Sequence, residues 1–246
     1  MVESIEQRLA AVDENGLVEF VREHLASLDA TLMRRLLRHP FLGTEAIQLL
    51  LEDRKVAGSY EVRRELAGHP RTPDARAMQL VATLYWRDLA RLGTETRVRP
   101  TVRRAAERRL ADRLPGLEVG EKVAIARVCS PGLVSRIGQD PNPRVIQALL
   151  ENPRLTEGVL LQLVSRDSAR PEVLAMVARD RRWGVRYRIR VPICRNPNTP
   201  VATALMQLPA LRKPDLRAVA DDRRLAKAVR QRANLLLGRL SRAGME

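Results

Sequence analysis

Apolar residues recur four positions apart along much of the chain, which is the spacing of one face of an α-helix. Ile47 and Leu51 form such a pair in one segment, and Leu160 and Val164 form another. A strand would instead alternate apolar and polar residues at every second position. The prevailing pattern therefore predicts packed helices.

Residues 185–191, VRYRIRV, are the exception, because apolar and basic residues alternate there as in a half-buried strand. Val185, Ile189 and Ile193 are nevertheless spaced by four, so a helix through this segment would bury one stripe. Pro192 would kink or shorten such a helix, since an interior proline costs ~3 kcal/mol or more. We predict a helix distorted at Pro192.

A short motif ending in His-Pro or Asn-Pro divides the chain into similar units. It occurs as LRHP, AGHP, LENP and CRNP, with a looser copy, VCSP. Pro131 and Pro153 are 22 residues apart, and Pro153 and Pro197 are 44 apart. Spacings of this length are typical of stacked repeats. We expect the residue two positions before the His or Asn to be buried in each unit, namely Leu37, Leu150 and Cys194.

The residues after each motif predict the start of a second helix. A threonine followed by Glu or Pro recurs there, as Thr44-Glu45, Thr72-Pro73, Thr156-Glu157 and Thr199-Pro200. Threonine accepts the unpaired N–H groups of a first helical turn, proline is tolerated at the first helical position, and glutamate complements the helix dipole. The expected fold is all-α, an α-solenoid (superhelical) of irregular two-helix repeats.

The segments RNPNTPVATALMQL, ENPRLTEGVLLQLV and GHPRTPDARAMQLV resemble the leucine-rich-repeat-variant (LRV) units of bacterial proteins, which are relatives of HEAT-like α-helical repeats. The resemblance is good over residues 118–225, fair over 34–82, and poor over 1–33 and 83–117. It implies helix pairs stacked in a curved superhelix, and it specifies architecture rather than activity. We expect an N-terminal helical cap at 1–33 and an α-solenoid at 34–246, with a less regular basic helical segment at 83–117.

Composition agrees with a helical core and adds a strong positive charge. Hydrophobic residues make up 45% and aromatic residues only 3%, so Leu, Val, Ala and Ile must fill the core. The net charge is +15, and only four of the 44 basic residues are lysine. Arginine suits carboxylate or phosphate partners, although a G+C-rich genome also yields arginine-rich surfaces. Without a membrane-length apolar run or a signal peptide, we expect a cytoplasmic protein.

The sequence contains no recognisable catalytic or metal motif. CxxC and HExxH are both absent, so we expect no metal and no cofactor. His39 and His69 occupy the motif position of Asn152 and Asn196, where we expect all four side chains to hydrogen-bond the turn. Cys194 is expected to be a small buried apolar residue.

Two arginine-rich stretches are the strongest functional signal. Seven arginines lie between Arg97 and Arg113, and seven more lie between Arg179 and Arg195. On a concave face they would form a positive groove for a phosphate backbone or an acidic protein; on a convex face they would simply be solvated. The candidate binding residues are Arg97, Arg99, Arg103, Arg104, Arg108, Arg182, Arg186, Arg188 and Arg190, with Trp86 and Trp183 as possible aromatic contacts.

The segment LYWRDLARL, residues 84–92, offers an enzymatic alternative. HEAT-like alkylpurine DNA glycosylases of the AlkD type use aromatic residues and an aspartate in a basic channel, and this segment is similar to that arrangement. On one helix, however, Trp86 and Asp88 would lie about 200° apart. We therefore expect Trp86 to anchor the core, with Arg87 and Asp88 solvated. The leading hypothesis is a non-enzymatic scaffold that binds an acidic partner; a glycosylase, or an assembly scaffold whose charge is incidental, remains open.

Overall fold

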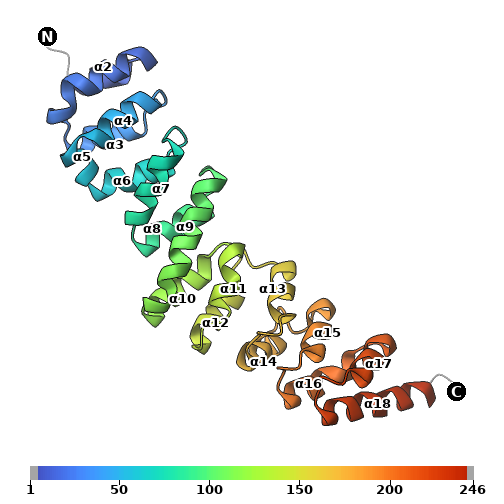
Figure 1. Cartoon of the computed structure of the whole chain (residues 1–246). Helices are drawn as coiled ribbons and strands as arrows, with labels where there is room; N and C mark the ends of the chain where they lie inside the picture. Colours follow the sequence, from blue (N-terminus) through green and yellow to red (C-terminus); the bar gives the residue numbers. More distant parts are fainter. Residues whose placement is uncertain (1–4, 243–246) are drawn as a thin grey trace. The chain divides into compact units, whose positions relative to one another are not determined.

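The fold is all-α, as the sequence predicts. The computed structural model describes residues 5–242; 73% of these residues are helical, and none of them forms a strand (Figure 1). The alternating segment is helical too, since α15 spans Tyr187–Arg195. Its interior Pro192 removes the hydrogen bond that would reach the carbonyl of Arg188.

The chain divides into two compact units, Met1–Arg113 and Leu114–Glu246. The helices of the first unit are α1 (Ile5–Ala11), α2 (Glu14–His24), α3 (Ala30–Leu37), α4 (Thr44–Glu52), α5 (Arg54–Gly58), α6 (Tyr60–Gly68), α7 (Asp74–Thr83), α8 (Trp86–Thr94) and α9 (Pro100–Arg113). Those of the second are α10 (Val119–Val128), α11 (Val134–Ile137), α12 (Pro143–Leu150), α13 (Glu157–Val164), α14 (Pro171–Arg179), α15, α16 (Val201–Gln207), α17 (Lys213–Asp221) and α18 (Lys227–Arg242).

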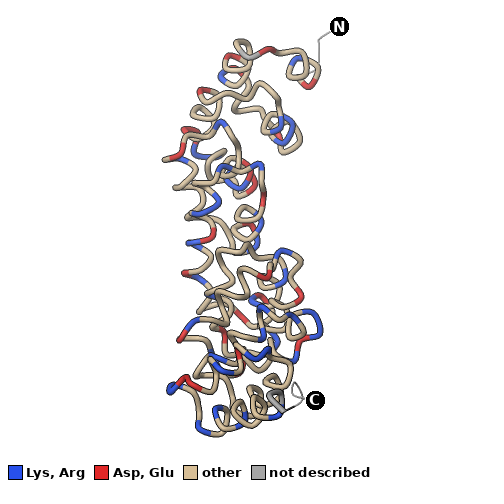
Figure 2. The backbone as a smooth tube through the Cα atoms, turned by 90° about the vertical axis from the view of Figure 1, so that its right-hand side faces the viewer, with Lys and Arg blue, Asp and Glu red and all other residues tan. Residues whose placement is uncertain are grey.

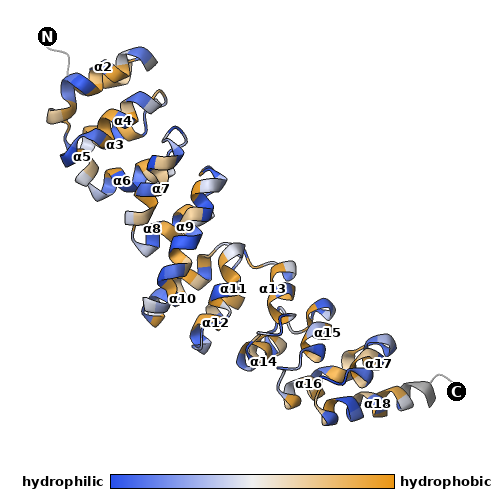
Figure 3. Ribbon diagram, in the orientation of Figure 1, coloured by the Kyte–Doolittle hydropathy of each residue, from blue (hydrophilic) through white to orange (hydrophobic). Residues whose placement is uncertain are grey.

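Within each unit, helices pack on neighbours close in sequence. In the first unit α2 contacts α4, α3 contacts α6, and α7 contacts both α6 and α9. In the second, α10, α12, α14, α16 and α18 contact one another in turn, as do α11, α13, α15 and α17. The helices carry both hydrophobic and hydrophilic segments, as packing on one side requires (Figure 3). These sequential contacts are consistent with stacked helix pairs.

The prediction for the position two residues before the turn is confirmed. Leu37, Leu150 and Cys194 are all buried. Ala67 and Ala178 are buried at the same place relative to His69 and Asp180. Burial raises the pKa of the Cys194 thiol to about 12, so it is an uncharged core residue, as expected.

Two details of the helix starts differ from the predictions. Val185 was expected in the buried stripe with Ile189, but it is 65% exposed because α15 begins only at Tyr187. Pro73 and Pro200 were expected inside their helices, but each is the N-cap residue. Both adopt an extended ψ, and their helices begin one residue later.

The turn threonines differ in role as a consequence. Only Thr156 caps a helix as predicted, by accepting the N–H of Val159. Thr72 and Thr199 instead donate back to the carbonyls of Leu66 and Ile193, because a proline separates each threonine from the helix that follows. The hydroxyl of Thr44, inside α4, donates to the carbonyl of Arg71.

One tyrosine–aspartate contact occurs once in each unit. The hydroxyl of Tyr60 donates to Asp88 and accepts the N–H of Tyr85. The hydroxyl of Tyr187 donates to Asp215 and accepts the N–H of Arg212. In both places the aspartate follows the tyrosine by 28 residues and the N–H follows it by 25. The two segments therefore adopt the same local structure.

Candidate functional site

Helix α9 presents two of the candidate arginines to solvent. Val102, Ala106 and Leu110 are buried at intervals of four and define the inner face of the helix. Arg104 and Arg108 lie on the opposite face, one turn apart, and both are exposed. No hydrogen bond or ion pair joins either guanidinium to another described residue. We call this pair the α9 ridge.

Other arginines of the first stretch hold α9 in place. Arg99 forms an ion pair with Asp74 at 2.8 Å and donates to the carbonyl of Thr72. Arg113 donates to the carbonyls of Leu84 and Ala82. Their hydrogen-bonding groups are thus largely committed within the unit. Arg103 is half-buried, and its Nε has no hydrogen-bond partner.

Trp183 is part of the core of the second unit. It is only 1% exposed, and its indole N–H donates to the carbonyl of Leu150 at 3.1 Å. The guanidinium groups of Arg182 and Arg186 lie 4.3 and 4.9 Å from its ring centroid. The neighbouring Gly184 lies so close to α14 that a Cβ would be 2.2 Å from the carbonyl oxygen of Ala178. In this structure the indole offers no open surface on which a base could stack.

The arginines of α15 divide between internal contacts and solvent. Arg186 pairs with Glu157 at 2.7 Å. Arg190 donates to Gln207 at 2.7 Å and to the carbonyl of Gly184 at 3.3 Å. The side chain of Arg188 is 75% exposed, with Glu157 3.7 Å from its Nε. Arg188 is therefore the most available of the three.

The two basic stretches belong to different compact units. Lysine and arginine occur along both units, with acidic residues between them (Figure 2). Each stretch is thus a candidate surface of its own unit.

The aromatic segment of α8 is built into the fold. Asp88 accepts the Tyr60 hydroxyl, so it is not merely solvated as expected. Trp86, the first residue of α8, is half-buried rather than a core anchor, and the Arg87 guanidinium lies 5.1 Å from its ring centroid. The contact between Tyr60 and Asp88 gives this carboxylate a structural role.

The His and Asn residues of the turns form the predicted hydrogen bonds, and the asparagines form further ones. His39 and His69 accept, through Nδ1, the N–H two residues ahead. Asn152 and Asn196 accept the equivalent N–H through Oδ1, at 2.8 and 3.0 Å. Each asparagine also donates through Nδ2 to two backbone carbonyls of the preceding repeat, which the sequence did not reveal.

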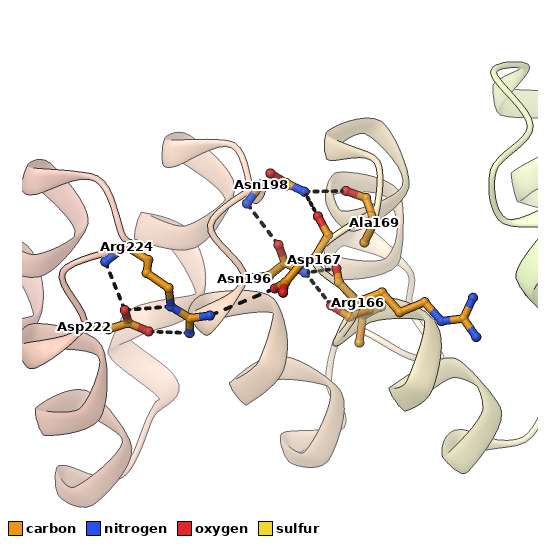
Figure 4. A network of polar contacts seen from close by, with 8 residues as sticks. Arg166, Asp167, Ala169, Asn196, Asn198, Asp222 and Arg224 are labelled. Carbon is orange, nitrogen blue, oxygen red and sulfur yellow. Dashed lines mark hydrogen bonds and ion pairs between the residues drawn. The ribbon is translucent and has the colours of Figure 1, made fainter.

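Figure 4 shows the polar contacts around Asn196, at the C-terminal ends of α13, α15 and α17. Asn196 reaches the carbonyls of Val164 and Arg166, both at 2.8 Å. Arg224 pairs with Asp222 at 2.8 Å and lies 4.0 Å from Asp167. Polar side chains thus link the C-terminal ends of α13, α15 and α17.

A cavity lies beside the His69-Pro70 turn of the first unit, and another lies beside the equivalent Asn196-Pro197 turn of the second. The first, of ≈ 340 Å³, is lined by residues that include Leu37, Arg64, His69, Leu92 and Arg97. The second, of ≈ 250 Å³, is lined by equivalent residues that include Val191, Asn196 and Arg224. Sequence reasoning missed both cavities, although the repeated spacing of Tyr60, Tyr187 and the two Pro-x-Thr-Pro turns marks their positions.

The first cavity differs from the second in the hydrogen bonding of its turn residue. His69 has no hydrogen bond through Nε2 to a described residue, whereas Asn196 fills the equivalent gap with its amide. Burial lowers the pKa of His69, and the nearby Arg71 and Arg99 lower it further. The imidazole is therefore neutral at pH 7, and its Nε2 carries the proton, since Nδ1 accepts a hydrogen bond.

Residues 5–242 contain no group of three or more His, Cys, Asp or Glu side chains placed to hold a metal ion. Nor does any helix in this range combine the length and apolar character needed to cross a membrane.

No protein-family model matches the sequence, and neither a curated protein nor a solved structure is significantly similar to it.

Proposed function

We propose that the chain is an α-solenoid of irregular two-helix repeats, of the LRV or HEAT-like kind, and that it works as a non-enzymatic scaffold. Its arginine-rich surface binds an acidic partner, either a protein or a nucleic-acid backbone. Support for the repeat comes from the sequential helix contacts and from the tyrosine–aspartate contact that occurs in both units.

The observation that carries the binding proposal is the α9 ridge. Arg104 and Arg108 project from one face with no carboxylate partner among the described residues. Two guanidinium groups one helical turn apart repel each other weakly, and a bound anion would relieve that repulsion. Planar guanidinium groups match the geometry of carboxylate and phosphate.

Three further exposed arginines extend the proposed surface within their own units, namely Arg97 in the first and Arg182 and Arg188 in the second. Arg99, Arg186 and Arg190 are assigned mainly to the internal contacts described above. Nothing in the described residues specifically favours the glycosylase hypothesis, since Trp183 is buried and Asp88 is engaged by Tyr60.

Fluorescence anisotropy tests the proposal with two labelled probes, a duplex DNA and an oligoglutamate peptide, at about 0.15 M salt. The full chain is expected to bind at least one of them. The double variant Arg104→Gln/Arg108→Gln should bind that probe more weakly. The matched control is Arg76→Gln/Arg87→Gln, which removes the same charge from exposed positions of α7 and α8. Equal losses in both variants would mean that net charge, not the α9 ridge, attracts the probe.

A further inference from the structure

The first-unit cavity has more unused hydrogen-bond donors than acceptors. Each of its three carboxylates is already engaged: Glu65 pairs with Arg64 at 2.9 Å, Glu95 pairs with Arg91 at 3.6 Å, and Asp88 accepts the Tyr60 hydroxyl. Arg97 lines the same cavity and is exposed, with no hydrogen bond or ion pair to a described residue. An incoming group would therefore meet N–H donors that still need an acceptor.

His69 adds a second donor that the rest of the fold leaves unused. In the second unit, Asn196 donates to Val164 and Arg166 and closes the gap between helices. The corresponding carbonyls in the first unit belong to Leu37 and His39, but His69 donates to neither. Its Nε2–H therefore has no acceptor among the described residues.

Arg64 is incompletely satisfied in the same place. One of its terminal nitrogens pairs with Glu65, but its Nε is buried without a hydrogen-bond partner. A buried donor without a partner costs free energy. A ligand that draws the guanidinium into a new position would remove that cost.

The cavity also has an apolar wall. Leu37 and Leu92 line it, and at the facing Gly68 a Cβ would come within 2.9 Å of Leu92. Such a wall suits the aliphatic stem of an acidic side chain. A phosphate backbone fits less well, because its charged groups have no aliphatic stem to pack against Leu37 and Leu92.

We propose that the cavity between the end of α3, α6 and α8 binds a carboxylate side chain of an acidic protein segment, with Arg97 and the Nε2–H of His69 as its hydrogen-bond donors. The proposal rests on the proposed function for the presence of an acidic partner. It deepens that function by assigning a protein carboxylate, rather than nucleic acid, to this site.

The binding test uses the full chain, a labelled oligoglutamate peptide and the matched oligoglutamine peptide. Arg97→Gln should weaken oligoglutamate binding about tenfold, because a hydrogen bond to a charged group is lost. Arg97 is exposed, so the substitution leaves the fold intact. Arg76→Gln removes one charge from α7 outside the cavity and should have a much smaller effect. Oligoglutamine should bind weakly to all of them.

Histidine NMR signals report the site directly. Oligoglutamate should shift the His69 ring signals and raise the pKa of His69, since a bound carboxylate stabilises the imidazolium form. The same shift should occur in Arg104→Gln/Arg108→Gln, because the α9 ridge is separate from the cavity. That variant distinguishes failure of the cavity proposal from failure of the proposed function.

Three results would overturn the proposal. One is oligoglutamate binding that leaves the His69 signals and pKa unchanged. The second is equal affinity in Arg97→Gln and wild type, with loss only in Arg104→Gln/Arg108→Gln, which would leave the α9 ridge as the sole site. The third is duplex DNA that displaces the peptide and shifts His69 equally well, which would assign the cavity to phosphate.

Discussion

Asn196 donates to the carbonyl of Val164 at 2.8 Å and so ties the end of α15 to the end of α13. The same amide reaches Arg166, and its oxygen accepts the N–H of Asn198. One side chain therefore satisfies three backbone groups in a place that is only 5% exposed.

Asn196→Asp should destabilise the second unit by about 2–4 kcal/mol. The substitution keeps the size of the side chain but replaces its two N–H donors with an oxygen that faces the carbonyls of Val164 and Arg166. Urea denaturation followed by circular dichroism measures the loss. Asn142→Asp is the control, because Asn142 contributes only its oxygen, to the N–H of Arg144, and its replacement should cost much less.

Leu150→Ala should cost about 2–5 kcal/mol, through lost apolar burial and the cavity that remains. Leu150 is 3% exposed, and its backbone carbonyl also accepts the indole of Trp183. Val185→Ala serves as the control, because Val185 is 65% exposed. Similar urea midpoints for the two variants would contradict the proposed register of the repeat.

Tyr60→Phe and Tyr187→Phe should each cost about 0.5–1.5 kcal/mol, since each removes one hydroxyl that donates to an aspartate and accepts a backbone N–H. The two losses should be similar because the contacts are the same. Differential scanning calorimetry measures them. Markedly unequal losses would show that the two segments differ in local stability despite their common geometry.

The stability of the first unit should fall as the pH drops below the ordinary His pKa of about 6.5. Folding lowers the pKa of His69, mainly by burial, so the unfolded chain takes up this proton first and is favoured. The contribution is fully present above the unfolded pKa and disappears as the pH falls through the folded value. Urea midpoints at several pH values should show this dependence, and His69→Asn should reduce it. If His69→Asn had the same pH dependence of stability as wild type, that dependence would come from other titratable groups.

The periodic features of the fold were predictable from sequence. The spacing of Leu37, Leu150 and Cys194 before each turn was enough to predict their burial, and it outweighed the strand-like alternation before Ile193. The helix starts were less predictable, because Pro73 and Pro200 can occupy either the N-cap or the first helical position and tertiary contacts decide between them.

The candidate site was predictable only in part. Local sequence gives the charge of an arginine but not its partners: Arg99 donates to the carbonyl of Thr72, 27 residues away, and Arg190 donates to Gln207, 17 residues away. The difference between Arg104, which is exposed, and Arg190, which is bound to Gln207 and Gly184, emerges only from packing. Trp183 is a similar case, since it lies in the turn before α15 and its indole N–H donates to the carbonyl of Leu150, 33 residues away.

The most direct test of an anion-binding α9 ridge is the salt dependence of duplex DNA binding, with the duplex used as a general polyanion. For wild type, log affinity should fall linearly with log salt, by about 0.9 for each phosphate contacted. Arg104→Gln/Arg108→Gln should flatten that slope by about 1.8 if both arginines contact phosphate, and Arg76→Gln/Arg87→Gln should leave it nearly unchanged. An identical slope in wild type and Arg104→Gln/Arg108→Gln, or no binding of either duplex or oligoglutamate near 0.15 M salt, would contradict the account.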